Sequence, residues 1–400
     1  MADIYGTLDA DQMAAVLSGP ITENQAMIYA NNVWHTSEFR QPLGPFQGSG
    51  DNGALIEIIN DLQEQGGKTY RHSFVHPLQG GVYKMDYILH GTEERLLNAY
   101  MDVGLVAWRK ALITSKLQQQ LPKWQLWPAM LSELANFQAK MKATHILECL
   151  LSENWNAVSG PELTGPPVQN DTVLHTGVYC SNQVIAGNNA TVNGLSEDDV
   201  FTPELIGIAK EVAYSGYRRD GQKTFRFKKP VVAGQTYDGV CFHHPFQKHD
   251  LRWHDPTRFE QWLLHGLPPG LQNPIWAGIG SMYVIDNVLM VELEGELADL
   301  LLFDANHVML DENGNEMAST VKGARAIFCG ARAAIRATGI EKILDIEKYD
   351  GSWFGRMITG AMEGVAKTQI SHPANSEMRD MGVVQIYTAA SHHNIVNPIQ

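Results

Sequence analysis

Apolar positions at helical spacing first appear in residues 54–65. The sequence ALIEIINDLQEQ carries apolar side chains three or four residues apart, at Leu55, Ile58, Ile59 and Leu62. The segment stops at Gly66 and Gly67, and glycine readily takes the left-handed conformation in which many helices end. The spacing predicts a helix over 54–65, and a shorter helix is predicted over 23–30.

A two-stranded excursion is predicted immediately after this helix. The segment TYRHSFVHPL is rich in β-branched and aromatic residues, and Gly80 and Gly81 interrupt the chain before it returns through Tyr87 to Val106. Such composition is typical of strands, and paired glycines are typical of a flexible tip. A lone two-stranded ribbon is only marginally stable in water, so we expect a partner to cover it. The apolar residues to be covered are Phe74, Val75, Tyr83, Tyr87 and Ile88.

A second helical pattern predicts a long helix from Pro128 to about Ser152. Its apolar positions drift only slowly off one face, and they are Met130, Leu134, Phe137, Met141, Leu147 and Leu151. Such a helix would be about 35–40 Å long. A further helix is predicted over 203–213, where the preceding acidic run SEDD suits the positive end of a helix dipole.

The second half of the chain predicts short strands alternating with helices. Strands are predicted over 231–242, 282–291, 307–309 and 383–388, and helices over 324–337 and 354–365. Asn313 and Gly314 lie between HVMLDE and NEMAST, a strong signal for a hairpin turn. The stretch QPLGPFQGSGDNG, which ends at Gly53, is rich in proline and glycine and predicts an extended arm outside the core.

Composition and charge exclude two classes of protein, a small single module and a sequence-specific nucleic-acid-binding protein. The chain has 400 residues, too many for one small module, and only 18% of them are charged against about 25% in typical soluble domains. We infer that much of its surface is hidden against partners. The formal net charge of −14, with no basic arm or stripe expected, argues against tight, sequence-specific binding of nucleic acid.

Cysteine spacing and the start of the chain predict a reducing compartment. The four cysteines lie far apart with no CxxC pair, which predicts free thiols: Cys149, Cys180, Cys241 and Cys329. The first twenty residues carry acids where a signal peptide has basic residues, and no apolar run approaches the roughly 20 residues of a membrane span. We therefore expect a soluble chain that stays inside the cell and makes no membrane contact.

Two short motifs imitate ligand-binding loops. Residues 48–53 spell GxGxxG, but the preceding QPLGPFQ is not the hydrophobic strand that dinucleotide binding requires, so we interpret them as a hinge. Residues 311–316 resemble the start of a calcium loop, but Glu316 replaces its turn glycine and Lys322 its bidentate glutamate. A hairpin turn explains this second motif.

The histidine-rich segment CFHHPFQKHDLRWHD is the one place where a metal or general-base site is conceivable. It holds His243, His244, His249, Asp250, His254 and Asp255. No HExxH spacing is present, and Pro245 is expected to break a helix that carried these residues. We favour structural histidines that bond to backbone groups at a strand end. No catalytic residue, metal site or cofactor site is predicted.

An ordered series of segments resembles the major capsid proteins of tailed bacteriophages with the Hong Kong 97 fold, in the branch found in short-tailed phages of the N-four type. The resemblance runs from about residue 53 to about 368. It rests on ALIEIINDLQEQGGKTYRHSFVHPL, LHGTEERL, a long helix, KKPVVAGQTYDGVCFHHPFQKHDLR, NPIWAGIGSMYVIDNVLMVE, ARAIFCGARAAI and YDGSWFGRMITGAMEGVAKT. It is weaker in the first fifty and last thirty residues.

The resemblance implies an α+β fold with five parts. These are an N-terminal arm (1–52), a helix with an extended β-hairpin loop (53–106), and a peripheral domain with a long spine helix (107–155). A mainly axial domain with returns to the peripheral domain (156–345) and a C-terminal peripheral or axial segment (346–400) follow. The implied function is self-assembly into hexamers and pentamers of an icosahedral head around double-stranded DNA, with no bond made or broken.

The expected partners are further copies of the chain, a portal protein, and scaffolding or decoration proteins, and the expected location is the virion, after assembly in the host bacterial cytoplasm. The acidic balance fits a container that does not trap its DNA. The predicted inter-subunit loop and hinge residues are Gly66, Gly67, Phe74, Val75, Gly80, Gly81, Tyr83, Tyr87, Ile88, Gly91, Glu93 and Glu94. No cross-linking pair is assigned.

Two alternatives stay open from the sequence. An encapsulin-like compartment shares the fold but encloses enzymes. A soluble metal-dependent enzyme would instead use the histidines between His243 and His254.

Overall fold

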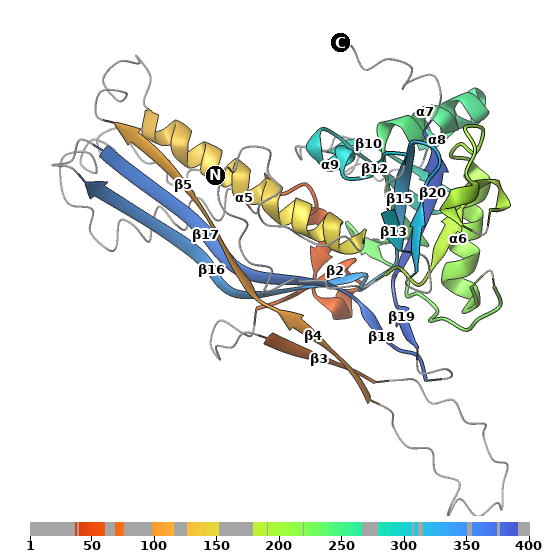
Figure 1. Ribbon diagram of the computed structural model, residues 1–400, viewed down its shortest axis with the longest axis horizontal. Coiled ribbons are helices and arrows are strands. Elements are labelled where there is room, and N and C mark those ends of the chain that lie inside the picture. The colour runs from red at the N-terminus through yellow and green to blue at the C-terminus, as the bar shows by residue number, and fades with distance from the viewer. Residues whose placement is uncertain are drawn as a thin grey trace, which may run out of the picture.

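Two β-sheets joined by a long helix form the body of the molecule (Figure 1). The computed structural model describes residues 37, 40–60, 69–75, 98–115, 126–151, 179–189, 191–218, 220–265, 279–305, 308–310, 315–349, 354–373 and 377–390. The elongated sheet, called here the long sheet, extends away from a rounder unit built on the second, compact sheet. The predicted α+β class is confirmed.

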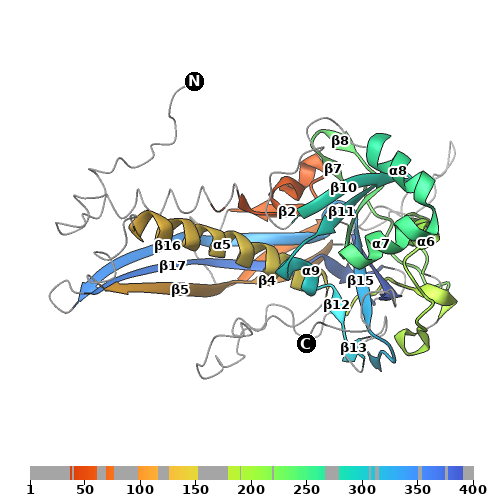
Figure 2. The same cartoon turned by 90° about the horizontal axis from the view of Figure 1, so that it is seen from above.

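The long sheet has the strand order β1-β2-β16-β17-β5. Its strands are β1 (Gln47–Gly48), β2 (Ile56–Ile59), β16 (Ala334–Tyr349), β17 (Phe354–Lys367) and β5 (Val106–Ser115). β16 and β17 form a long antiparallel ribbon, β5 joins the free side of β17 antiparallel, and β2 joins β16 parallel. Helix α5 (Leu126–Leu150) runs along this sheet in both views (Figures 1 and 2).

The compact sheet has the order β10-β11-β9-β15-β20-β6, with β12 paired to β15 at one end. Its strands are β6 (Gln183–Ile185), β9 (Gly239–His243), β10 (Ile279–Ile285), β11 (Val288–Leu293), β12 (Leu302–Phe303), β15 (Gly323–Cys329) and β20 (Val383–Ala389). The helices around it are α6 (Pro203–Ser215), α7 (Pro245–His254), α8 (Pro256–His265) and α9 (Glu296–Asp299). It is a mixed sheet, because β11 runs parallel to β9 and β6 parallel to β20.

Both faces of the compact sheet are covered. Ile327 and Cys329 of β15 face a core shared with the C-terminal half of α5 and the start of the long sheet. Their neighbours Ala326 and Phe328 face a second core shared with α6, α7 and α8. Every residue of β15 is buried, so the strand has no polar face. The compact sheet is therefore the centre of the molecule, with the long sheet attached through the first core.

Shorter elements form hairpins around this body. They are β3 (Thr69–Val75) with β4 (Asn98–Gly104), β7 (Val231–Val232) with β8 (Gln235–Thr236), β13 (Val308–Leu310) with β14 (Glu316–Ala318), and β18 (Gln369–Ser371) with β19 (Met378–Asp380). Single 3-10 turns are η1 (Gly44–Phe46), η2 (Gly50–Asn52), η3 (Ala186–Asn188) and η4 (Val192–Gly194). The antiparallel β13 and β14 confirm the hairpin predicted from Asn313 and Gly314, whose turn lies outside the described residues.

The helices predicted over 324–337 and 354–365 are wrong. These segments form β15, the start of β16, and β17. Because β15 is buried on both faces, it lacks the alternation of apolar and polar residues that marks a strand, and an apolar run of this kind is not distinguished from a buried helix by periodicity. The alanines and methionines of these segments then favoured the helical interpretation.

Two predictions near the start of the described chain are also wrong. Within the predicted helix 54–65, Ile56–Ile59 is strand β2, which pairs with β16; residues 61–65 lie outside the described part. The stretch predicted to lie outside the core instead buries Leu43 and Phe46 completely in the first core. Residues 48–53 form β1 and η2 and lead into β2, so they lack the strand-turn-helix context of a dinucleotide loop.

The remaining expectations hold with small shifts. Helix α5 begins at Leu126, two residues before Pro128, and α6 covers the predicted 203–213. The predicted strand 282–291 is the β10–β11 hairpin, which turns at Asp286 and Asn287, and 231–242 contains the β7–β8 hairpin before β9. The helix predicted over 23–30 lies outside the described residues. No helix in the described ranges is long and apolar enough to cross a membrane.

Gly364 of β17 permits close packing against the start of the β4–β5 edge. A Cβ atom there would clash with the carbonyl oxygen of Gly104, whereas a Cβ on Gly104 would meet nothing within 4 Å. We expect Gly364→Ala to lower the free energy of unfolding by about 1–3 kcal/mol, because backbone must move. Gly104→Ala, the matched control, should change it by less than about 1 kcal/mol. Urea unfolding measures both, and equal effects would contradict the packing argument.

Candidate assembly site

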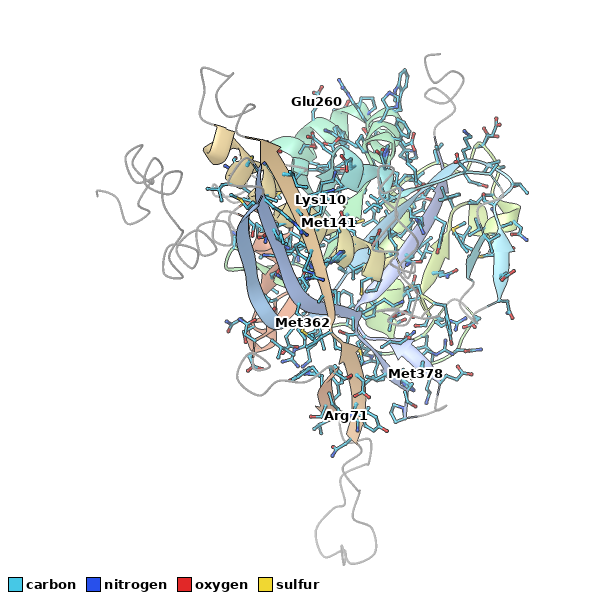
Figure 3. The ribbon with its side chains drawn as sticks, turned by 60° about the vertical axis from the view of Figure 1, so that its left-hand side comes forward. Arg71, Lys110, Met141, Glu260, Met362 and Met378 are labelled. Carbon is cyan, nitrogen blue, oxygen red and sulfur yellow. The ribbon has the colours of Figure 1, made fainter. Side chains whose placement is uncertain are left out.

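The β3–β4 ribbon has one buried and one exposed face. Phe74 is 7% exposed and packs with Val103, Leu105 and Ile335 in a small core at the base of the long sheet. The next residue, Val75, is 63% exposed, as the alternation of a strand requires. The ribbon is thus anchored by one face, and Figure 3 shows Arg71 on it at the lower side of the molecule.

The exposed face is ordered by side-chain contacts across the two strands. Arg71 lies opposite Asp102, and its Nε donates to Asp102 Oδ1 at 2.7 Å. The Arg71 guanidinium also lies over the ring of Tyr100, 4.4 Å from its centroid. Arg71 holds the pKa of the Asp102 carboxyl below its usual range through this hydrogen bond. Tyr100, 62% exposed, and Val75 therefore form a pre-ordered apolar surface with a polar rim.

Only two of the twelve predicted loop and hinge residues lie in the described part of the chain. The structure places Phe74 inside, where it anchors the ribbon, and Val75 outside, where it is available to a partner. The expectation that both face a partner is wrong for Phe74. Outside the described residues lie Gly66, Gly67, Gly80, Gly81, Tyr83, Tyr87, Ile88, Gly91, Glu93 and Glu94.

Further large exposed apolar residues escaped the sequence reasoning. They include Tyr100 on β4, Ile113 on the edge strand β5, and Trp253 on α7. The signal for Tyr100 was present, since NAYMDVG alternates and Val103 must point inward. Trp253 carried no such signal: it stands among charged residues, and its indole Nε1 donates to His249 Nε2 at 2.7 Å.

The histidine cluster is structural. His243 is fully buried, with Nδ1 3.1 Å from the His244 carbonyl oxygen and Nε2 2.9 Å from the Tyr283 hydroxyl. His244 caps α7, since its Nδ1 accepts from the Phe246 backbone N–H and its own N–H donates to the Gln247 side chain. Pro245 does not break this helix; it occupies the first turn, where its missing N–H costs nothing. Among the described residues, no group of three or more His, Cys, Asp or Glu is arranged to hold a metal ion.

Burial of these two histidines predicts a pH-dependent stability. It lowers the pKa of His243 and of His244 from 6.5 to about 4, because the charged ring loses its water. Unfolding restores the ordinary pKa, so between pH 6.5 and 4 the unfolded chain binds protons that the folded chain does not. The free energy of unfolding should fall by up to about 2 kcal/mol per histidine between pH 7 and pH 5.

His244→Asn, which preserves the helix cap, should flatten this pH dependence. Urea unfolding from pH 7 to pH 5 measures the slope, and a slope unchanged by the substitution would contradict the assignment. Carboxylates with a lowered pKa, such as Glu363, do not affect the slope between pH 7 and pH 5. The stability that they contribute to the folded protein is lost only as pH falls below about 4.5.

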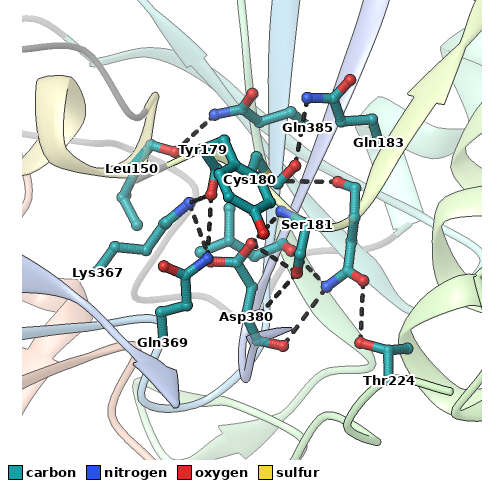
Figure 4. Close-up of polar contacts among 12 residues, drawn as sticks. Leu150, Tyr179, Cys180, Ser181, Gln183, Thr224, Lys367, Gln369, Asp380 and Gln385 are labelled. Atoms are coloured by element: carbon teal, nitrogen blue, oxygen red, sulfur yellow. Dashed lines mark hydrogen bonds and ion pairs between the residues drawn. The ribbon is translucent and has the colours of Figure 1, made fainter. Parts of the chain in front are cut away.

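A buried polar junction joins the two sheets (Figure 4). Lys367, the last residue of β17, has its Nζ 2.9 Å from Asp380 Oδ1 and donates to the Tyr179 carbonyl oxygen at 2.9 Å. Asp380 Oδ2 accepts from the backbone N–H of Ser181 at 2.5 Å and from its hydroxyl at 2.9 Å. Asp380 raises the pKa of Lys367 against the effect of burial, so the amine stays charged. The junction fixes the end of the long sheet to the base of β20.

A second buried ion pair fixes α5 to the long sheet. Arg336 of β16 donates to Glu363 of β17 from Nη2 at 2.8 Å, and both side chains are 2% exposed. Glu363 also accepts from the indole N–H of Trp108 on β5 at 3.1 Å and lies 3.6 Å from Nδ1 of His145 on α5. The cations around it, Arg336 foremost, hold the pKa of Glu363 well below its usual range although burial opposes them. One carboxylate thus connects three strands and the helix.

The two buried ion pairs hold α5 and the two sheets together, and the β3–β4 ribbon remains exposed.

All four cysteines are buried, and they are free, as predicted. Burial raises the pKa of Cys180 to about 12, which leaves an unreactive thiol. A model of a protein family described as phage capsid protein matches residues 8–392. The chain belongs to the phage capsid protein family.

Solved phage capsids have the same fold. The capsid protein of Ralstonia phage GP4 superposes with a TM-score of 0.69 at 18% identity, over 89% of this chain and 91% of its own. The cyanophage Pam1 capsid gives 0.62 at 16% identity over 88% and 93%, and the head of Helicobacter pylori bacteriophage KHP40 gives 0.62 at 14% over 88% and 91%. None of the curated proteins compared with the chain matches it.

The family and the fold confirm the central prediction. This phage capsid protein has the Hong Kong 97-like fold of the capsid structures, and its role is structural. The encapsulin-like compartment and the metal-dependent enzyme receive no support, since the family is one of phage capsid proteins and His243 and His244 are engaged in packing and capping.

Proposed function

We propose that this protein is the subunit that assembles into hexamers and pentamers of an icosahedral phage head around double-stranded DNA. The observation that carries the proposal is the β3–β4 ribbon, which exposes Val75 and Tyr100 on a face that Arg71 and Asp102 hold in order. A pre-ordered apolar face on a projecting ribbon fits a second copy, because little conformational freedom is lost when it is covered. Identical subunits joined in this head-to-tail way close into rings.

The parts of the subunit take their roles from this arrangement. We assign the β3–β4 ribbon to the extended hairpin loop, and α5 with the long sheet to the spine helix and peripheral domain. The unit built on the compact sheet is assigned to the axial domain, which meets its copies around the ring axes. The N-terminal arm is assigned to residues before Ser37, since Ser37 is buried against Lys142 of α5 and Leu43 and Phe46 belong to the core.

Partners and location follow from a capsid role. We propose further copies, a portal protein, and scaffolding or decoration proteins as partners, a place in the virion, and assembly in the host bacterial cytoplasm. The net charge of −14 supports a wall that encloses DNA without gripping it. We propose no catalytic step, and the N-four-type branch remains the proposed placement within the family.

Expression of the full chain alone, followed by sizing and negative-stain electron microscopy, tests this function. Shells, tubes or rings of five or six subunits are the expected result. A monodisperse monomer or dimer that stays unassembled after addition of the phage's own scaffolding protein and at high protein concentration would contradict it.

A further inference from the structure

A basic strip runs along one side of the compact-sheet unit of this acidic protein. Lys223, Arg226 and Lys228 are exposed, while Thr224 and Phe227 between them are buried. The segment is extended, so the buried residues fix it to the body and the cations point outward. None of the three cations forms an ion pair with another residue of the described ranges. Lys229 is different, because its Nζ is 2.7 Å from Asp238.

An acidic surface lies on the same unit and is also unpaired. Glu197, Asp198 and Glu204 are exposed, and within the described part of the chain no cation pairs with them. Their neighbour Asp199 is not available, since its Oδ2 accepts from the backbone N–H and the hydroxyl of Ser196, both at 2.8 Å. The unit thus carries three free carboxylates in one place and three free cations in another.

Helix α6 separates the two surfaces. The acidic surface lies at its N-terminal end, where the Asp199 carbonyl accepts from Ala389 N–H at the end of β20. The basic strip lies at its C-terminal end, where Phe227 N–H donates to the Ala213 carbonyl, and Thr224 bonds to Asn182 near the junction. Thirteen residues of helix span about 20 Å, twice the Debye length at 0.1 M salt. The surfaces are therefore too far apart to neutralise each other within one molecule.

The position of α6 suits a contact between neighbours in a ring. In Figure 1 it stands upright at the edge of the molecule farthest from the tip of the long sheet. The acidic surface at its N-terminal end and the basic strip at its C-terminal end therefore lie at opposite ends of that edge. A ring built by head-to-tail contacts brings one side of each subunit against the other side of the next. The end carrying Glu204 would then meet the end carrying Arg226 of the following copy.

We propose that the basic strip of one copy docks on the acidic surface of the next copy around the ring axis. The inference rests on the proposed function and adds the surfaces that set the register of the ring. Packaged DNA is the less suitable occupant of the strip, because three cations are few for a polyanion and the rest of the chain is acidic. Exposed ion pairs contribute little each, but complementary patches fix the orientation of association and speed it.

Charge reversal tests the proposal on the full chain. We expect Asp198→Lys with Glu204→Lys to lower the yield of shells or rings about tenfold or more at low salt, and Arg226→Glu with Lys228→Glu to do the same. Combining all four substitutions restores complementarity at every contact and should bring the yield back to within about threefold of the wild type. The control for the acidic pair is Glu133→Lys with Glu260→Lys, which changes net charge by the same amount at exposed sites on α5 and α8.

The outcomes separate the two proposals. Normal assembly of both reversed proteins, or no rescue in the fourfold variant although circular dichroism shows it folded, would overturn the docking surface and leave the capsid function standing. Loss of DNA binding by filter assay in the Arg226→Glu, Lys228→Glu protein with unchanged assembly would also overturn it, in favour of a phosphate-binding strip. Failure of every protein, the wild type included, to form rings or shells even at high concentration and with the phage's own scaffolding protein would overturn the proposed function and the docking surface with it.

Discussion

Asp380→Asn is expected to lower the free energy of unfolding by about 3–5 kcal/mol. The substitution keeps an acceptor for Ser181 but removes the negative charge that faces Lys367, whose side chain is 1% exposed. The buried ammonium group then keeps its hydrogen bond to the Tyr179 carbonyl oxygen but has no counter-charge to offset the loss of its water. Urea unfolding of the purified subunit measures the change.

The matched control is Asp304→Asn, which removes the same charge from an exposed pair. Asp304 lies 3.4 Å from Lys322, with side-chain exposures of 82% and 52%. This substitution should cost less than about 1 kcal/mol. Adding Lys367→Met to Asp380→Asn should recover part of the loss, because no unpaired charge then remains buried. Equal losses at Asp380 and Asp304 would contradict the role of the junction.

Glu363→Gln should have an effect of similar size, about 3–5 kcal/mol, at a different place. It leaves the Arg336 guanidinium uncompensated at 2% exposure and weakens the contact with His145 on α5. We expect α5 to loosen from the long sheet. Backbone amides near His145 should therefore exchange hydrogen faster than in the wild type, whereas exchange in α6 should stay the same. Hydrogen exchange with mass spectrometry and urea unfolding measure the two effects.

Glu296→Gln provides the comparison for this substitution. Glu296 pairs with Lys140 of α5 at the surface, where both side chains are well exposed, at 71% and 44%. Its loss should change the free energy of unfolding by less than about 1 kcal/mol and leave exchange in α5 unaltered. If Glu363→Gln proved equally mild, the carboxylate would not be what joins the helix to the sheet.

The sequence predicted those elements whose pattern reflects one buried face. The helices α5 and α6, the β3–β4 ribbon and the β13–β14 hairpin were predicted because one side of each is exposed or its turn has a distinctive sequence. Strand β15 failed because both faces are buried, so Ala326 and Ile327 are equally apolar although they face different cores. Burial on two sides depends on tertiary contacts that no local pattern contains.

The polar sites were likewise predicted where the local sequence determines them and missed where tertiary contacts do. Free cysteines and structural histidines were predicted, since the cysteine and histidine spacings are not those of metal sites and Pro245 was expected to break a helix. The ion pairs Lys367–Asp380 and Arg336–Glu363 were not, because the partners lie 13 and 27 residues apart and their meeting depends on β-sheet register. Pro245 was judged by its effect inside a helix, whereas His244 and Gln247 make it part of a capped first turn.

Electron cryomicroscopy of the assembled particle tests the central claim most directly. The account predicts a closed shell in which the Val75 and Tyr100 face of every β3–β4 ribbon is covered by a neighbouring copy of the chain. A shell in which that face points into solvent, or in which a different protein forms the wall, would contradict it.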